Sequence, residues 1–118
     1  MKILFRFQTL DIWHLANEIG DELMDVADEL EKRRYYRFAE QLRASSLSES
    51  NNIAEEAGSD YSRDFRRFLN DSRRSTFENA NVVFTLRRRG LISEAVAEGF
   101  LARLVVLSRK LTRFKQRL

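Results

Sequence analysis

The sequence predicts an all-α protein with an up-down-up-down four-helix bundle, and three observations support this fold class. The 118-residue chain contains no proline and only four glycines, so residues that interrupt helices are rare. Apolar residues recur at steps of three and four along four separate stretches, as on the buried face of a helix. The links between these stretches are short, as they are between antiparallel neighbours in a bundle. We therefore expect residues 1–118 to form a single domain.

The first helix is expected over residues 10–31, with Thr9 or Asp11 as its N-cap. Its outer face is strongly acidic, and the basic residues 32–34 follow its end, where cations complement the helix dipole. We interpret this basic run as a helix terminus rather than as a binding patch. The apolar stripe consists of Ile12, Leu15, Ala16, Ile19, Leu23, Val26, Ala27 and Leu30.

The second helix is expected over residues 37–57, closed by Gly58 in the left-handed conformation. Its stripe is unusual because small and polar residues replace the expected aliphatic ones across two turns. If Asn52 faces inward, it needs a polar partner such as Glu55, Glu78 or a backbone carbonyl. The stripe runs through Phe38, Leu42, Ser45, Ser46, Glu49, Ile53 and Ala54.

The third and fourth helices are expected over residues 63–89 and 93–117, with Ser62 and Ser93 as N-caps. Both helices are apolar on more than one side, and a domain of this size does not easily bury two faces of one helix. An oligomer is the simplest explanation. The third stripe is Phe65, Phe68, Leu69, Ser72, Thr76, Asn79, Val83 and Leu86, with Phe77, Ala80 and Phe84 on a second face. The fourth stripe is Ala97, Phe100, Leu104, Leu107, Leu111, Phe114 and Leu118, flanked by Leu101 and Val105.

The net charge of +3 is distributed unevenly along the chain. Residues 1–60 contain 13 acidic and 7 basic residues, a net charge of −6, whereas residues 61–118 contain 5 acidic and 14 basic residues, a net charge of +9. This asymmetry has two interpretations. The basic half binds an anionic partner, or the two halves attract each other within the fold or between subunits.

The residues present argue against an enzyme and against a resident cofactor. Without cysteine there is no disulfide framework and no thiolate zinc site, and cytoplasm is the expected location. His14 is the only histidine, so one chain cannot supply the paired Glu-x-x-His motifs of a di-iron bundle. A phosphate-binding glycine loop and a nucleophile elbow are also missing from the sequence. No apolar run approaches the ~20 residues that span a membrane.

Three stretches of the sequence contain spaced motifs that match known patterns. The pattern F-x-x-L-x-V-W-x-x-A is matched by Phe7, Leu10, Ile12, Trp13 and Ala16. The pattern Q-L-R-R-A-x-x-S-I-P-x-N-I-A-E-G is matched by Gln41, Leu42, Arg43, Ser48, Asn52, Ile53, Ala54 and Glu55. The patterns S-x-x-E-F-x-x-F-L and G-S-x-x-E, in the third stretch, are matched by Ser62, Asp64, Phe65, Phe68, Leu69, Ser75 and Glu78. In these motifs the chain resembles a bacterial four-helix-bundle family, first noted in reading frames within intervening sequences of large-subunit ribosomal RNA genes.

The chain departs from these patterns at several positions. Ala44 replaces the second Arg, residues 49–50 replace Ile-Pro, Glu56 replaces the last Gly, and Arg74 replaces a small residue. Without the proline, the second helix is expected to be continuous. The resemblance implies a cytoplasmic bacterial protein, a homopentamer in several members, with no established catalytic activity. A more distant similarity, to the accessory protein of diversity-generating retroelements, implies a reverse transcriptase and nucleic acid as partners.

The matched polar residues form one candidate site. Carboxylates beside an Arg and an amide bind a small ligand in one interpretation. In the other, which we favour, they form an internal network of hydrogen bonds and ion pairs that fixes helix register. The set is Gln41, Arg43, Asn52, Glu55, Ser75 and Glu78.

The second candidate site is a set of basic residues on the third and fourth helices that would bind RNA or DNA backbone. Arginine predominates over lysine, as suits bidentate phosphate contacts. The sequence therefore predicts a non-enzymatic oligomer that binds nucleic acid, with a protein–protein adaptor as the alternative. The predicted contacts are Arg63, Arg66, Arg67, Arg73, Arg74, Arg87, Arg88, Arg89, Arg109, Lys110, Arg113 and Lys115, with Arg103 and Arg117 nearby.

Overall fold

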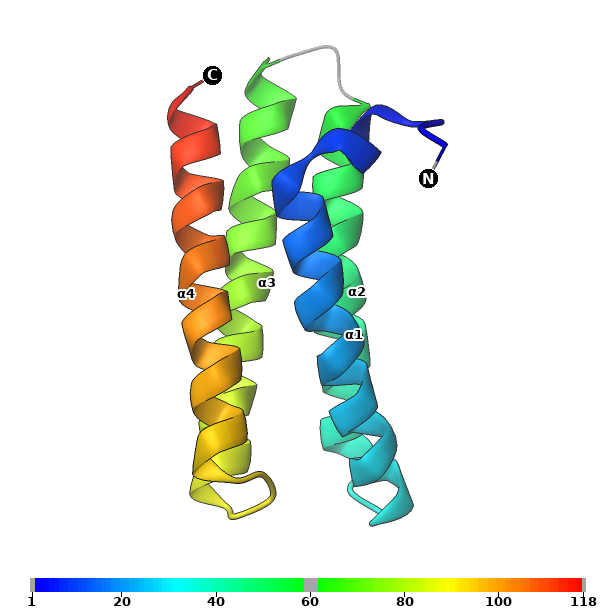
Figure 1. Cartoon of the computed structure of the whole chain (residues 1–118), viewed down its shortest axis with the longest axis vertical. Coiled ribbons are helices and arrows are strands. Elements are labelled where there is room, and N and C mark those ends of the chain that lie inside the picture. Colours follow the sequence, from blue (N-terminus) through cyan, green and yellow to red (C-terminus); the bar gives the residue numbers. More distant parts are fainter. Residues whose placement is uncertain (1, 59–61, 118) are drawn as a thin grey trace.

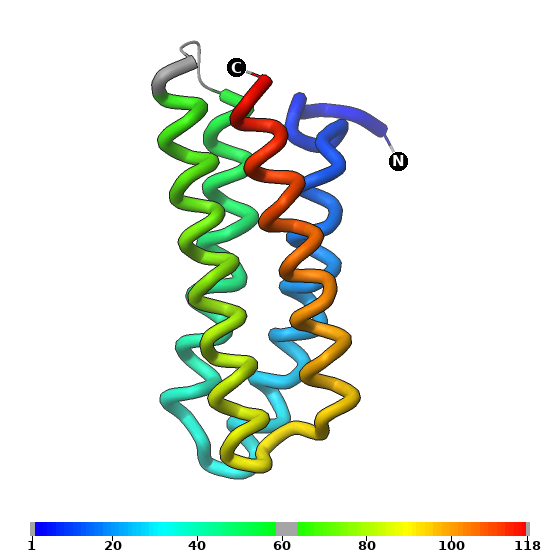
Figure 2. Tube along the Cα trace, turned by 90° about the vertical axis from the view of Figure 1, so that its left-hand side faces the viewer, coloured from blue at the N-terminus to red at the C-terminus, as the bar shows by residue number. Residues whose placement is uncertain are grey.

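The computed structural model describes residues 2–58 and 62–117, with the backbone alone described at 62 and 63. It consists of four antiparallel α-helices in an elongated bundle of 44 × 27 × 23 Å (Figures 1 and 2). The helices are α1 (Asp11–Lys32), α2 (Tyr36–Ala57), α3 (Ser62–Arg88) and α4 (Glu94–Gln116), preceded by the short 3-10 helix η1 (Arg6–Thr9). Each α-helix begins and ends within one residue of the expected range, so the predicted fold class is confirmed. Helix α2 is continuous, as expected without the proline.

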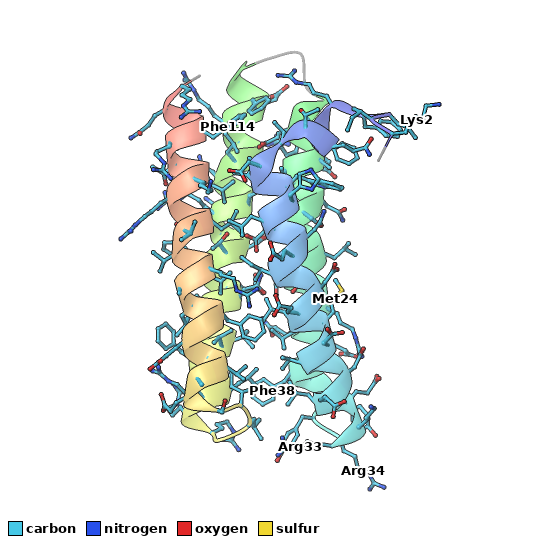
Figure 3. The ribbon with its side chains drawn as sticks, viewed as in Figure 1. Lys2, Met24, Arg33, Arg34, Phe38 and Phe114 are labelled. Atoms are coloured by element: carbon cyan, nitrogen blue, oxygen red, sulfur yellow. The ribbon has the colours of Figure 1, made fainter. Side chains whose placement is uncertain are left out.

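The core lies between the four helices and follows the predicted stripes. Leu23, Leu42, Val83 and Leu107 are completely buried, one from each helix. Near the end of the bundle that holds the C-terminus, Phe114 of α4 (Figure 3) stacks on Phe65 of α3 with ring centroids 5.5 Å apart. Burial of these aliphatic and aromatic side chains supplies the main stabilising term, typically ~1.5–3 kcal/mol for each. The last residue of the predicted fourth stripe, 118, lies outside the described residues.

Two helix ends at one end of the bundle share the same backbone motif. After α1, Arg34 adopts a left-handed φ of 67°, and the N–H of Tyr35 donates to the carbonyl of Leu30 at 2.8 Å. After α3, Gly90 has φ 71°, and Leu91 N–H donates to the Leu86 carbonyl at 2.8 Å. Both are Schellman motifs, which satisfy carbonyl groups that the helix leaves open. The basic run at 32–34 is thus a helix terminus (Figure 3).

The prediction of a left-handed Gly58 was wrong. Gly58 has φ −92° and continues the last turn of α2, with its N–H donating to the Glu55 carbonyl at 3.1 Å. A right-handed residue satisfies the helix end in this way without a positive φ, so a glycine is not required there.

The predicted caps had mixed outcomes. Neither Thr9 nor Asp11 caps α1, because Leu10 occupies the N-cap position and the Thr9 hydroxyl donates to the Arg6 carbonyl at 2.8 Å instead. Ser93 caps α4 as predicted, since its Oγ accepts a hydrogen bond from Val96 N–H at 3.1 Å. Helix α3 begins at Ser62, whose side chain is not among those described, so the predicted cap at Ser62 lies outside the described part of the chain.

Ion pairs join the acidic α1 to its neighbours. Glu22 pairs with Arg103, and Asp11 pairs with Lys110, both across the α1–α4 seam. These contacts lie at the protein surface, where such pairs contribute at most ~1 kcal/mol each. Part of the charge asymmetry is therefore compensated within the chain. Among the described residues, no helix is long and apolar enough to cross a membrane.

Candidate functional site

A groove follows the surface between α3 and α4. The two helices lie side by side and antiparallel (Figure 2), so the first half of α3 and the last half of α4 share one end of the bundle. Three hollows lie along this seam, and a fourth, lined by α3 alone, adjoins them; neighbouring hollows share Arg73, Phe77 or Arg109 in their walls. Because the hollows are contiguous, we describe them as one feature, the α3–α4 groove.

The part of the groove nearest the C-terminus is basic. It contains six of the twelve predicted nucleic-acid contacts, together with polar side chains such as Asn70 and Thr112. Among the described residues that line the groove, none is acidic. This concentration of positive charge is expected to attract anions. The six are Arg66, Arg73, Arg74, Arg109, Arg113 and Lys115.

Arg73 lies at the centre of this basic half, because it lines three of the four hollows. Its guanidinium carbon is 5.5 Å from the centroid of the Phe77 ring, within the range of a cation–π contact. Its Nε is buried and has no hydrogen-bond partner among the described residues. Nearby, Lys115 Nζ donates to Asn70 Oδ1 at 2.8 Å and connects α4 to α3. Arg73 is thus partly desolvated beside other cations, an arrangement that an anion would stabilise.

The remaining part of the groove is apolar. Its walls include Phe77, Ala80, Phe84, Leu101 and Val105, around a cavity of about 270 Å³. The exposed fractions of Phe77, Phe84 and Val105 are 59%, 43% and 47%. These are the residues that the sequence placed on second apolar faces of the two helices, and the structure brings them together.

Of the other predicted contacts, those with described side chains do not line the groove. Arg67 stacks over the Phe68 ring at 5.1 Å, and Lys110 pairs with Asp11. The basic run 87–89 closes α3 at the opposite end of the bundle, because α3 is antiparallel to α4. The side chain of residue 63 lies outside the description. The structure therefore divides the predicted contacts into one convergent set and several separate positions.

A buried polar layer lies between α2 and α3, around Glu49. The Glu49 carboxyl group accepts hydrogen bonds from Thr76 Oγ1 at 2.6 Å and from Asn79 Nδ2 at 2.9 Å. Ser45 Oγ donates to Asn79 Oδ1 at 2.5 Å, and Ser72 Oγ lies 3.4 Å from the Glu49 carbonyl oxygen. Burial raises the pKa of Glu49 to about 7, although both hydrogen bonds lower it. All of these residues lie on the predicted stripes.

A second carboxyl group, Glu56, is buried two turns further along α2. Its side chain is completely inaccessible, and neither of its carboxyl oxygens has a hydrogen-bond partner among the described residues. Burial raises the pKa of Glu56 to about 8, because the charged form loses its hydration. Glu56 therefore stays protonated in the folded protein at neutral pH, which avoids placing a bare charge in the core.

The residues of the predicted polar cluster do not converge on one site. Arg43 reaches α1, where its Nη2 lies 2.7 Å from Asp28 Oδ1 and 3.2 Å from Glu31 Oε2. The hydrogen bonds to Asp28 and Glu31 raise the pKa of Arg43. Gln41 Nε2 donates to Glu78 Oε1 at 2.9 Å, so this part of the motif links α2 to α3 at the surface.

The other members of the cluster lie at separate positions, with Asn52 bonded within its own helix, Ser75 buried against α2 and Glu55 exposed. Asn52 Nδ2 donates to the carbonyl of Ser48, one turn earlier, at 3.0 Å. Ser75 Oγ lies 3.4 Å from Ser48 Oγ, and the Glu55 side chain is exposed. Asn52 is half-buried, and its partner is a backbone carbonyl, one of the three kinds of partner expected for it, rather than Glu55 or Glu78.

Comparison with models of protein families matches residues 8–113 to the 23S rRNA-intervening sequence protein family. The chain belongs to this family. The match covers most of the described bundle, from η1 to the last turn of α4, and it confirms the resemblance inferred from the three motifs. The family's description names no catalytic activity. Searches of curated proteins and of solved structures gave no match.

Sequence reasoning missed one buried polar residue in this family member, Glu56. The signal was present, because Glu49, Ile53 and Glu56 follow the i, i+4, i+7 spacing of a buried helix face. The predicted stripe ends on Ala54 instead, which is only half-buried. Because a carboxylate near a helix end is usually solvated, the spacing alone does not predict that residue 56 is buried.

Proposed function

We propose that this protein is a non-enzymatic, cytoplasmic homo-oligomer that binds the backbone of RNA or DNA in the basic half of the α3–α4 groove. The single observation that carries the proposal is the convergence of six basic side chains from two helices on a groove that contains no described acidic residue. Phosphate groups spaced along a strand would neutralise these cations in succession. The family name, which refers to 23S rRNA, is consistent with a nucleic-acid partner.

The contacts in this proposal are made to phosphates and do not distinguish one base sequence from another. Arginine side chains offer bidentate hydrogen bonds to phosphate oxygens, and Arg109 and Arg113 are both exposed on α4. The partly desolvated Arg73 would interact with a phosphate more strongly than a fully hydrated cation. We therefore expect affinity that depends steeply on salt and weakly on sequence.

Self-association in this proposal uses the apolar half of the groove. Phe84 and Val105 are about half-exposed there, and a second copy would remove them from water. The exposed α1 face of that copy offers the acidic side chains of Glu18, Asp21 and Asp25, which complement the positive charge of the groove. A ring of five copies is the stoichiometry that the family resemblance implies.

Charge-neutralising variants test the nucleic-acid proposal. The groove variant combines Arg109→Gln with Arg113→Gln, and the matched control combines Arg88→Gln with Arg89→Gln at the opposite end. Fluorescence anisotropy with a labelled mixed-sequence oligonucleotide, at several salt concentrations, measures both affinity and salt slope. The groove variant should bind more weakly, and its salt slope should fall by about 0.7 for each single-strand phosphate contact removed. The control should retain the wild-type slope.

Equal losses in the two variants would contradict a groove-centred site, since both remove the same charge. Absence of binding by the wild-type protein at low salt would reject nucleic-acid binding altogether. Light scattering behind size exclusion, with and without the oligonucleotide, reports the oligomeric state in the same samples. A monomer under all conditions would reject the proposed assembly.

The alternative is a protein–protein adaptor with no affinity for nucleic acid. The observation that favours it is the pairing of the acidic α1 with basic residues of α4, through Glu22 with Arg103 and Asp11 with Lys110. In an assembly of several copies, the acidic α1 of one copy would dock in the same way on the basic groove of another. Oligomerisation that weakens at high salt, in a protein that ignores oligonucleotides, would support this alternative.

A further inference from the structure

We propose that the hollow formed by Asn70, Arg73, Arg74 and Phe77 accepts an unpaired nucleobase together with its phosphate, so that the protein prefers single-stranded to double-stranded nucleic acid. This inference rests on the proposed function and names the class of ligand for the same groove. The hollow has a volume of about 420 Å³ and lies where the basic and apolar halves of the groove meet.

The Phe77 ring provides a stacking surface. Its exposed fraction of 59% is large for a phenylalanine, and the Arg73 guanidinium lies over the ring 5.5 Å from its centroid. Because Phe77 keeps this exposure with the guanidinium in place, part of the ring surface remains open to a ligand. A base stacked on a ring, beside an arginine, is the arrangement by which single strands bind aromatic side chains.

The groups around the ring match the rest of a nucleotide. Arg74 is exposed, and among the described residues its one ion pair is with Asp71, one turn away at 3.6 Å, which a phosphate would readily replace. The Oδ1 atom of Asn70 accepts a hydrogen bond from Lys115 Nζ, which fixes the amide and leaves its NH₂ group as a donor. The hollow thus combines cations for a phosphate, a ring for a base and an amide for a polar edge.

A duplex uses only part of this arrangement. Paired bases are stacked on their neighbours and have no free face, so a duplex presents phosphates to the cations and nothing to Phe77. A single strand presents both. The difference in affinity between the two forms therefore reports the contribution of the ring.

The test compares Phe77→Leu, which keeps an apolar side chain but removes the ring, with Phe5→Leu as the matched control. Phe5 is similarly exposed but lies outside the groove, so its replacement should leave single-strand binding unchanged. Three labelled DNA probes of equal length are used: a mixed-sequence single strand, its duplex, and a single strand of abasic sites. Wild type should bind the single strand more tightly than the abasic strand. Phe77→Leu should weaken single-strand binding roughly 5- to 150-fold, the effect of losing one stacked base. Its affinity for the abasic strand should stay within about twofold.

Equal single-strand and abasic affinities in the wild type would overturn the inference, as would a Phe77→Leu variant that binds the single strand normally. In both cases binding that still depends on Arg109 and Arg113 would leave the proposed function intact. A further outcome is a Phe77→Leu variant that loses affinity for all three probes and also shows a smaller mass by light scattering than wild type. That result would place Phe77 in a subunit interface and would also overturn the inference. Loss of all binding in the wild type would reject both proposals.

Discussion

Stability should depend on pH through Glu56, and replacing Glu56 with leucine should remove that dependence. In the unfolded chain the carboxyl group titrates near its ordinary pKa of 4.5, whereas burial raises its pKa in the folded protein to about 8. Between these values the folded state holds a proton that the unfolded state has released. The free energy of unfolding therefore falls as pH rises, by about 1.4 kcal/mol per pH unit for this one group.

The magnitude follows from the interval over which the two states differ. From pH 4.5 to about pH 7.5 the loss for Glu56 amounts to roughly 4 kcal/mol, and above pH 8 the dependence levels off. This is a large part of the ~5–15 kcal/mol that stabilises a typical domain. Glu49 contributes with the same sign, since burial raises its pKa to about 7. Leucine at position 56 has no charge to bury and fills a similar volume, so Glu56→Leu should be more stable than wild type at neutral pH.

The assay is urea unfolding followed by far-UV circular dichroism at pH values between about 5 and 8. The difference in unfolding free energy between Glu56→Leu and wild type should grow by about 1.4 kcal/mol per pH unit and reach a plateau above pH 8. Glu55→Leu, at the exposed neighbouring position, is the control and should show a flat difference. A pH-independent difference for Glu56→Leu would refute the argument, because it would mean that Glu56 has the same pKa in both states.

Three further predictions concern the backbone and the surface, and urea or thermal unfolding measures each of them. Arg34→Gly should stabilise the bundle by about 1 kcal/mol and Gly90→Ala should destabilise it by a similar amount, because both positions have a left-handed φ. The two substitutions must change the free energy of unfolding in opposite directions; changes of the same sign would contradict the Schellman geometry. Gly20→Ala should stabilise α1 by about 0.5–1 kcal/mol, since a methyl group there meets its nearest neighbours at 3.7 Å, an ordinary contact distance. Breaking the pair Glu22–Arg103 with Glu22→Gln should cost less than ~1 kcal/mol, and that cost should shrink in high salt.

The helices were predictable from the sequence because the spacing of apolar residues within one segment is enough to identify a helix there. The positions of the other helices are not needed for this. The bounds of α4 follow from the spacing of its apolar residues and from the cap at Ser93. The conformation of Gly58 at the end of α2 was not predictable in this way. Gly58 permits a positive φ without requiring it, so the residue type alone does not fix the backbone conformation.

Contacts between helices were harder to predict, because they depend on the relative register of two stripes. Glu49, Thr76 and Asn79 were all on predicted stripes, yet nothing in the sequence pairs them. The convergence of Arg73 with Arg109 was accessible in principle, since an antiparallel pair joined by a short link brings together the far ends of its helices. The same rule separates the basic run 87–89 from that groove.

The polar layer and the α3–α4 groove are connected through α3. Thr76 faces α2 and bonds Glu49, while the next residue, Phe77, lines the groove beside α4. Sliding α3 along α2 by one turn, about 5.4 Å, would carry Thr76 and Asn79 beyond hydrogen-bond distance of Glu49 and leave its carboxyl group buried without a partner. An aliphatic interface would resist such a slide less, because its contacts are not directional. The hydrogen bonds of Glu49 therefore favour a single register of α3 against α2, and that register fixes the height at which Arg73 and Phe77 lie along the bundle.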